Sequence, residues 1–434
     1  MPAVLANRAY GDAVRGAERK AALAVAVERE DSLVCRRDID ILAQDGSADA
    51  ATLRVVDRHV KAMLWAKGGF RLYLAGPEPV CSAVSEAYRH GGAREFDADV
   101  MARAYGEPFA VEIVDERDVP LQRESASAIG GHLEGCRIGF DLGASDYKVA
   151  AVIDGRAVFS TEIPWNPSVE KNPEYHYRHI MNGLREAASH MPRVDAIGGS
   201  AAGIYIENQV KIASLFRAVP EDVFEAGVRP LFLRVQKEFG VPLVVINDGD
   251  VTALAGAMSL GRNALLGIAM GSSQAAGYLD PRGCIPGYLN ELAFAPVDFS
   301  ATAAVDEWSG DRGVGALYFS QQAVNKLAPA AGIAFPADMP LPERLKEVQA
   351  RVDSGEEGAE KIFATIGVYL GYALPHYAEY YDFRDVLILG RVTSGRGGEI
   401  ITDEARAVLS RAFPDLAEKV TVSLPDEKSK RVGQ

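Results

Sequence analysis

Paired cysteines are missing from this sequence. Its four cysteines are scattered along the chain, and no two of them are close in sequence: Cys35, Cys81, Cys136 and Cys284. Zinc ribbons and disulfide frameworks need closely spaced cysteines, so the sequence favours neither of them. A reducing compartment fits this usage best, and we expect a cytoplasmic protein.

Long apolar segments are also absent. No run approaches the roughly 20 apolar residues of a membrane helix, and the first residues, MPAVLANRAYGDAVRG, lack the apolar core of a secretory signal. The sequence shows neither an internal repeat nor a low-complexity tract. We therefore expect no membrane partner. A chain of 434 residues is too long for one ordinary core, which predicts two or three globular domains.

Positive charge is scarce. The chain has 46 Lys and Arg against 60 Asp and Glu, a net charge of -14. General affinity for nucleic acid needs a basic surface, so we expect no nucleic-acid partner. A nucleotide is still compatible with this charge, because Mg²⁺ and backbone N–H groups can bind phosphates on an acidic protein.

Short apolar segments alternate with longer periodic ones, which is typical of an α/β protein. The predicted strands are 71–75, 110–114, 137–141, 147–153, 242–247, 264–270 and 385–389. The predicted helices are 175–190, 227–239, 250–260, 316–328, 341–353, 357–380 and 401–412.

Two segments are loop-rich. The stretch 120–134 is polar and rich in glycine, as linkers are, and a softer break lies around 281–313. We therefore predict three parts: an N-terminal α/β extension of unknown role over 1–130, one lobe over 131–248 and a second lobe over 249–434.

A turn between two strands, in IGFDLGASDYKVAAVIDG at 138–155, is the strongest local signal. The first strand ends at Asp141, the chain turns through Gly143 and Ser145, and the next strand begins at Tyr147. Such a hairpin presents N–H groups, a hydroxyl and a carboxylate, which suit phosphates and a hydrated Mg²⁺. Ordinary turn chemistry gives the same pattern, so the segment alone leaves both interpretations open.

A second strand end carries acidic residues, in VPLVVINDGDVTALAGAM at 241–258. The apolar strand runs into Asn247 and Asp248, and a helix follows. Folds of the α/β class place ligands at the carboxyl ends of strands, and a carboxylate there could accept a proton from a substrate hydroxyl. The alternative is that Asp250 only caps the helix.

Two further strands end in small residues. The first is a strand in LLGIAMGSSQAAGYLD, which is interrupted at Gly271, Ser272 and Ser273, where a phosphate could approach the backbone. VLILGRVTSGRGGEIITDEARAVL ends a strand at Gly390 and starts a helix near Ile401. That loop suits a purine, although a plain connection between strand and helix would look similar.

In this order the four segments resemble the signature segments of the ROK family (repressors, open reading frames and kinases), which belongs to the actin/hexokinase/heat-shock ATPase superfamily. The resemblance spans the chain from Arg137 to its end. It implies a two-lobed actin/hexokinase-like (ribonuclease H-like) ATPase fold, here with an additional N-terminal α/β domain. It also implies ATP and Mg²⁺ as cofactors and phosphorylation of a hydroxyl on a sugar or sugar-like polyol. We expect a small-molecule sugar or polyol substrate and a homodimer.

The resemblance also gives individual residues roles. It implies that Asp248 is the catalytic base, that Asn247 contacts the sugar, and that Asp141 lies near Mg²⁺ through water. The implied nucleotide-binding positions are Gly143, Ser145, Lys148, Gly271, Ser272, Ser273 and Gly390. The match is loose in places: GSS replaces the family's Gly-Thr-Gly, and only Gly390 clearly matches its Gly-Gly-Gly segment.

The chain departs from the family at its sugar and zinc motif. In NELAF at 290–294, Glu291 keeps a sugar-contacting carboxylate, but Phe294 stands where the family has a zinc-binding His. The cysteine cluster is absent, and Cys284 alone cannot replace a tetrahedral site. In DEWSGDRGVGAL, Glu307 matches a second sugar ligand. We predict no structural zinc and an acceptor other than glucose; the alternative is that Phe294 is a core residue.

The ROK family also includes repressors, so a non-catalytic regulator that senses a sugar or nucleotide is the second hypothesis. Those repressors carry an N-terminal helix-turn-helix. Residues 1–120 here contain strand-like segments such as RLYLAGP and no basic recognition helix. The presence of both Asp141 and Asp248 favours an enzyme.

The missing cysteine cluster generates the first testable prediction. Elemental analysis of the purified protein after dialysis against EDTA should detect no stoichiometric zinc, because no tetrahedral set of N and S ligands is available to hold it. One zinc ion per chain would show that the ligands have been misassigned.

Overall fold

The computed structural model describes residues 1–43, 47–126 and 134–425. The chain packs into two compact units. The larger unit contains the described residues of Met1–Ala102, Glu107–Ala128 and Thr252–Gln434, and the smaller unit contains those of Arg103–Gly106 and Ile129–Val251. The N-terminal and C-terminal parts of the chain therefore share one unit, and the central part forms the other.

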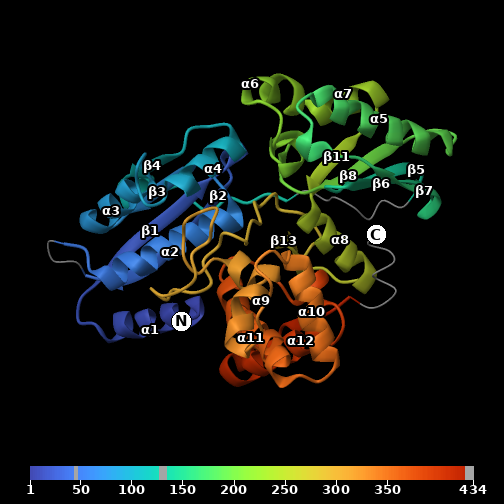
Figure 1. The fold of residues 1–434 in the computed structure, drawn as a ribbon. Coiled ribbons are helices and arrows are strands. Elements are labelled where there is room, and N and C mark those ends of the chain that lie inside the picture. Colours follow the sequence, from blue (N-terminus) through green and yellow to red (C-terminus); the bar gives the residue numbers. More distant parts are fainter. Residues whose placement is uncertain (44–46, 127–133, 426–434) are drawn as a thin grey trace. The chain divides into compact units, whose positions relative to one another are not determined.

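The smaller unit is built on a five-stranded sheet with the order β11-β8-β5-β6-β7 (Figure 1). Its strands are β5 Cys136–Leu142, β6 Asp146–Ile153, β7 Arg156–Pro164, β8 Ala196–Ala201 and β11 Leu243–Asn247. Strands β5, β8 and β11 are parallel, and β5, β6 and β7 form an antiparallel meander. The remaining elements of this unit are β9 Ile204–Ile206, β10 Gln209–Ile212, α5 Pro173–Ser189, α6 Glu221–Val223 and α7 Leu231–Phe239.

Helices α5 and α7 bury one apolar side each in the core of this unit. Helix α5 begins where the side chain of Asn172 accepts a hydrogen bond from the Glu174 N–H, and Pro173 fits its first turn. Its buried residues include Ile180 and Leu184, one turn apart. Helix α7 ends at Gly240, whose left-handed φ of 66° suits glycine. Short-range sequence signals thus define both helices.

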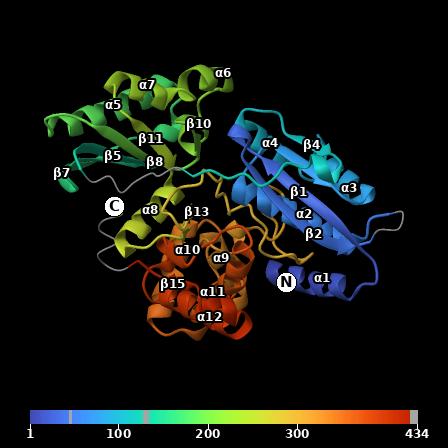
Figure 2. The ribbon, with the colours of Figure 1, turned by 180° about the vertical axis from the view of Figure 1, so that it is seen from behind.

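The larger unit contains a second sheet, with the order β13-β12-β14-β15. Its strands are β12 Leu265–Met270, β13 Gln274–Leu279, β14 Asp385–Leu389 and β15 Thr421–Ser423. Strand β12 is antiparallel to β13 and parallel to β14. The helices around it are α8 Asp248–Leu260, α9 Gln321–Leu327, α10 Leu341–Asp353, α11 Glu357–Tyr377, α12 Arg396–Ala412 and α13 Pro414–Ala417 (Figure 2).

The N-terminal part of the larger unit has its own four-stranded sheet, with the order β2-β1-β3-β4. The strands are β1 Lys20–Glu28, β2 Val34–Leu42, β3 Arg71–Ala75 and β4 Ala110–Ile113. Only the β3–β4 pair is parallel. The helices of this part are α1 Ala3–Gly16, α2 Ala50–Lys67, α3 Glu78–Tyr88 and α4 Glu95–Tyr105. None of the helices in the described part of the chain combines the length and the apolar character needed to cross a membrane.

A buried ion cluster fastens this N-terminal part to the loop-rich segment 281–313. The carboxylate of Asp311 lies 2.6 Å from Arg58, 2.9 Å from Arg94 and 3.3 Å from Lys61. Burial alone would raise the pKa of Asp311, but the three cations hold it well below its usual range. Removing one partner of such a cluster leaves a buried charge without compensation, which is costly. Segment 281–313 is thus a packing partner of α2 and of the residue before α4.

Strand β8, next to the central strand β5 of the smaller unit's sheet, supplies a test of how that sheet is packed. A Cβ at Gly199 in β8 would overlap the ring of Phe140, whereas a Cβ at the neighbouring Gly198 meets no atom within 4 Å. We expect Gly199→Ala to lower the free energy of unfolding of this unit by roughly 1–3 kcal/mol, because an overpacked core must shift. Urea unfolding measures it, and Gly198→Ala is the matched control. Equal stability of the two variants would contradict the described packing.

Candidate active site

The carboxyl ends of β5, β8 and β11 bring the predicted acidic residues to one edge of the sheet. Asp141 pairs with Ser200 of β8, and Ser200 pairs in turn with Ile246 of β11. Because adjacent strands lie about 4.8 Å apart, the backbones of β5 and β11 are roughly 10 Å apart here. Strand β11 then runs through Asn247 into Asp248, the first residue of α8. Asp141 and Asp248 therefore lie at the same edge of the sheet.

The two carboxylates influence each other electrostatically. Burial raises the pKa of Asp248, and the negative charge of Asp141 raises it further, whereas a hydrogen bond from the Gly249 N–H opposes the shift. Asp141 itself is exposed and Asp248 is half-buried. A carboxylate with a raised pKa holds a proton more readily, which suits a group that must accept one. A carboxylate such as Asp248, whose pKa is shifted by burial and by a charged neighbour, is a candidate for a functional site.

Asn247 is held in place by the backbone around it. Its amide N–H donates to the Gly203 carbonyl at 2.7 Å, and its Oδ1 accepts from the Gly249 N–H at 2.7 Å. Gly203 has a φ of 130°, and a Cβ there would overlap the Ile212 carbonyl, so this position requires glycine. A primary amide has two donors and two acceptor lone pairs. These two bonds leave Asn247 with one N–H and one lone pair.

Trp165 fixes the turn between β5 and β6. Its indole N–H donates to the Gly143 carbonyl at 2.8 Å, and its backbone N–H donates to the Ser145 carbonyl at 3.0 Å. The indole is buried. Strand pairing sets Lys148 directly opposite Asp141, which puts both side chains on the same face of the sheet. The positions predicted for the first phosphate loop thus cluster around one supported turn.

The other two predicted loops are neighbours in the larger unit. Strands β12 and β14 are parallel, and their carboxyl ends lead into Gly271–Ser273 and Gly390, respectively. Gly390 has a φ of 100°, and a Cβ there would lie 2.6 Å from the Met270 carbonyl. Ser272, Ser273 and Gly390 are exposed. The chain then enters α12 at Arg396, five residues earlier than the start predicted near Ile401.

The two glutamates predicted to bind sugar lie in the irregular segment 281–313 of the larger unit. Glu291 is half-buried and its carbonyl accepts a hydrogen bond from the Phe294 N–H, whereas Glu307 is exposed. The ring of Phe294 packs 4.5 Å from Trp65 and 5.6 Å from Phe96. Phe294 therefore takes part in the contact between this segment and helices α2 and α4.

In the ranges 1–43, 47–126 and 134–425, no three His, Cys, Asp or Glu side chains are grouped so that they could hold a metal ion. Mg²⁺ needs fewer protein ligands, because it keeps most of its water and binds through one or two carboxylates together with phosphates. The exposed carboxylate of Asp141, beside that of Asp248, has the right donor chemistry for it.

Sequence reasoning missed one residue that is coupled to Asp248 and one that holds the first half of β11. The charge of Asp248 adds to burial in raising the pKa of Tyr205 in β9. Asn208 brackets β11: its amide donates to the Leu243 carbonyl at 2.7 Å, and its Oδ1 accepts from the Val245 N–H at 2.9 Å. No local pattern marks either residue, because their partners are 35 or more positions away in sequence.

No family model matches the chain, and no curated protein matches it. Solved structures do. A ROK family glucokinase from Streptomyces griseus, in complex with glucose and AMPPNP, is 19% identical, with a TM-score of 0.50 over 69% of this chain and 97% of that one. A ROK hexokinase from Thermus thermophilus is 16% identical, with a TM-score of 0.51 over 69% and 96%. A ROK family transcriptional regulator, a homologue of the E. coli MLC protein, is 16% identical, with a TM-score of 0.56 over 77% and 81%.

At these identities the likeness shows the fold. The chain has the ROK fold, of the two-lobed actin/hexokinase-like type, as its sequence predicted. Both kinases and a regulator share this fold, so the chemistry must be argued from the site itself.

The coupling between the two carboxylates generates a prediction. Replacing Asp141 by Asn should lower the pKa of Asp248, because the charge that helps to raise it is removed; the pKa should stay above its ordinary value, because burial, the larger cause, remains. NMR titration of ¹³C-labelled aspartate measures the shift. Asp222→Asn, at an exposed position of α6, is the control. An unchanged Asp248 pKa in Asp141→Asn would show that the two groups are not coupled.

Proposed function

We propose that this protein phosphorylates a hydroxyl group of a sugar or sugar-like polyol with ATP. The observation that carries the proposal is the pair of carboxylates, Asp141 and Asp248, at the carboxyl edge of three parallel strands. One is exposed and the other is half-buried with a raised pKa. Two carboxylates in different environments can divide the tasks of metal binding and proton transfer.

In this proposal Asp248 acts as the general base. It accepts the proton of the acceptor hydroxyl as the oxygen attacks the terminal phosphoryl group of ATP, and ADP leaves. Its position at the first residue of α8 is fixed by the Gly249 N–H, which donates to Asp248 Oδ1 at 3.0 Å. Base catalysis of this kind contributes typically 10²–10⁴-fold to a rate.

Asp141, Gly143, Ser145 and Lys148 are assigned to the phosphates and to Mg²⁺. Trp165 donates hydrogen bonds to two carbonyls of the turn. The shape of the turn therefore does not depend on a bound ligand. Bound Mg²⁺ would neutralise charge on the phosphates. Lys148 lies on the same face of the sheet as Asp141, where its ammonium can pair with a phosphate oxygen.

The loops of the larger unit are assigned to the rest of the nucleotide. Gly271, Ser272 and Ser273 supply a small, exposed turn for phosphate oxygens, and Gly390 opens an exposed loop for the adenosine. The close approach of Gly390 to the Met270 carbonyl supports a requirement for glycine at this point.

The acceptor is assigned to Asn247, Glu291 and Glu307. Asn247 has one N–H and one lone pair left for a hydroxyl once its two backbone bonds are made. Carboxylates accept hydrogen bonds from hydroxyl groups, so the two glutamates suit a substrate that carries several hydroxyls. Phe294 offers no such bond, and it is engaged with Trp65, which supports an acceptor that differs from glucose. Location in the cytoplasm and assembly as a homodimer stay predictions from the sequence.

A regulator that binds a sugar or nucleotide without catalysis is the second candidate. It is favoured by the likeness to the ROK transcriptional regulator, which covers 77% of this chain. Against it, residues 20–113 contain a four-stranded sheet with helices where a repressor of this family would carry a helix-turn-helix.

The two candidates are separated by one assay. The protein is incubated with Mg²⁺, ATP and pools of monosaccharides and polyols, and ³¹P NMR follows the formation of a phosphomonoester. The kinase proposal expects a product from at least one pool, formed in proportion to ADP. Binding of a sugar without any product would favour the regulator.

A substitution at Asp248 tests the assignment of the base. Asp248→Asn keeps the shape of the side chain and removes its basicity, so turnover should fall by roughly 10²-fold or more. The dissociation constant for ATP should stay within a few-fold, because the base touches the acceptor. Kinetics and calorimetry measure the two quantities, with Asp222→Asn as control. Turnover close to that of the parent protein would remove Asp248 from the mechanism.

A further inference from the structure

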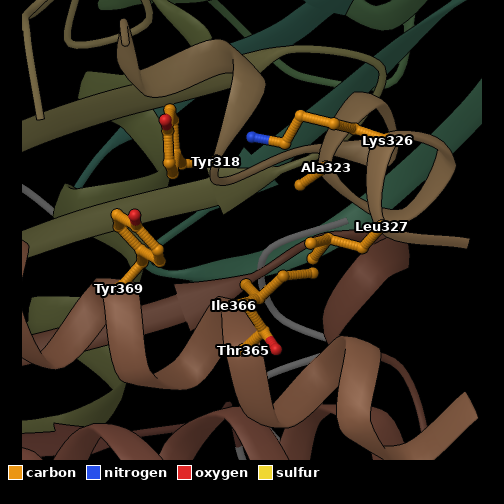
Figure 3. A pocket seen from close by; sticks show the side chains of 7 residues that line it. All are labelled: Tyr318, Ala323, Lys326, Leu327, Thr365, Ile366 and Tyr369. Atoms are coloured by element: carbon orange, nitrogen blue, oxygen red, sulfur yellow. The ribbon is translucent and has the colours of Figure 1, made fainter. Parts of the chain in front are cut away.

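A hollow in the larger unit is lined by none of the residues assigned above. Its inner recess, of about 20 Å³, has room for about one water molecule. The side chains that line the recess are Tyr318, Ala323, Lys326, Leu327, Thr365, Ile366 and Tyr369 (Figure 3). The recess shares Tyr318, Lys326, Leu327 and Tyr369 with a wider hollow of about 480 Å³, a volume typical of small-molecule sites.

Lys326 places an ammonium group at this hollow. Among the residues that the structure describes, no hydrogen bond or ion pair reaches it, and it lies 3.7 Å from the centre of the Tyr318 ring. Figure 3 shows it pointing from α9 towards Tyr318. Burial lowers the pKa of Lys326 to about 8, and the charge of Asp298 opposes that shift. The group is therefore a cation at neutral pH, held near an aromatic face.

Asp298, the acidic residue at the same hollow, is occupied by other donors. Its Oδ2 accepts from the hydroxyls of Tyr318 at 2.8 Å and Tyr369 at 3.0 Å, and its Oδ1 accepts from the Ser300 N–H at 2.7 Å and from the Met1 amino group at 2.6 Å. Burial would raise its pKa, but these donors lower it, so it stays ionised. Its four bonds leave little capacity for Lys326.

The hydroxyl groups of Tyr318 and Tyr369 limit how a ligand in the hollow can bind them. Each donates its only hydroxyl proton to Asp298, so its oxygen can serve the hollow only as an acceptor. The centres of their rings lie 4.7 Å apart, and the two rings form one wall of the hollow. The ammonium of Lys326 lies over the Tyr318 ring of this wall. The hollow therefore offers an ammonium donor for an anionic group and phenolic oxygens for hydroxyl donors.

We propose that this hollow binds a small organic anion that carries hydroxyl groups, such as a hydroxycarboxylate or a sugar phosphate, with its anionic group on Lys326 and a hydroxyl on Tyr318 or Tyr369. Both anions share the chemistry that the site recognises: an oxyanion for the ammonium and O–H donors for the tyrosines. Inorganic phosphate has the first feature and carries no sugar hydroxyls.

Calorimetry on the full chain, without ATP, tests the proposal with three probes: gluconate, glucose 6-phosphate and inorganic phosphate. At least one hydroxylated anion should bind at millimolar concentration or below, and Lys326→Gln should weaken it roughly ten-fold or more, because a charge-assisted hydrogen bond is lost. Lys326→Arg should retain most of the affinity. Lys346→Gln, which removes an exposed charge from α10, is the matched control and should change nothing.

Two further variants sharpen the result. Tyr369→Phe removes a phenolic acceptor and should weaken the hydroxylated probes more than inorganic phosphate. Asp248→Asn should bind the same probe as the parent protein, which separates this hollow from the proposed phosphoryl-transfer site. Thermal melting checks that each variant is folded. The proposal is overturned if none of the probes binds up to about 10 mM, or if folded Lys326→Gln and Lys326→Arg both bind as the parent protein does.

Discussion

The candidate site depends on the parallel pairing of β5, β8 and β11. Their register sets Asp141 level with Ser200 and Ile246, so the carboxyl ends of the outer two strands deliver Asp141 and Asp248 to the same edge. Burial and the negative charge of Asp141 both raise the pKa of Asp248, so this carboxylate holds a proton more readily than an ordinary aspartate. Hydrogen bonds hold the backbone on both sides of this pair. Trp165 fixes the turn after Asp141, and bonds to the backbone fix Asn247, the residue before Asp248.

Much of the fold follows from continuous apolar runs. The run 385–389 predicted β14, which is buried along most of its length. The segments 137–141 and 242–247 predicted β5, in which buried residues alternate with more exposed ones, and β11, which is only partly buried. Other elements were missed because their composition is ambiguous. Strand β1, KAALAVAVE, is rich in alanine, which favours helices. Helix α12 starts at Arg396 because Gly397 and Gly398, which suggested a loop, pack closely against Phe363 and the Thr393 carbonyl.

The candidate site was predictable where the signal is local. Asp141 and Asp248 each follow an apolar strand, and strand ends meet at one edge of a parallel sheet. Tyr205 was not predictable, since the strand that carries it approaches Asp248 only through tertiary packing. The same limit applies to Asp311, whose partners lie more than 200 residues earlier in the chain. Contacts between residues so far apart in sequence depend on the whole fold, and the local sequence does not predict them.

The pH dependence of phosphoryl transfer tests the central claim most directly. A base must be ionised to accept a proton, so kcat/KM should fall as the pH is lowered. The midpoint of that fall should lie above 3.8, the ordinary pKa of an aspartate, because burial and Asp141 raise the pKa of Asp248. Circular dichroism at each pH would confirm that the protein stays folded. A profile that is flat down to pH 3.8 in folded protein would contradict the assignment of Asp248 as the base.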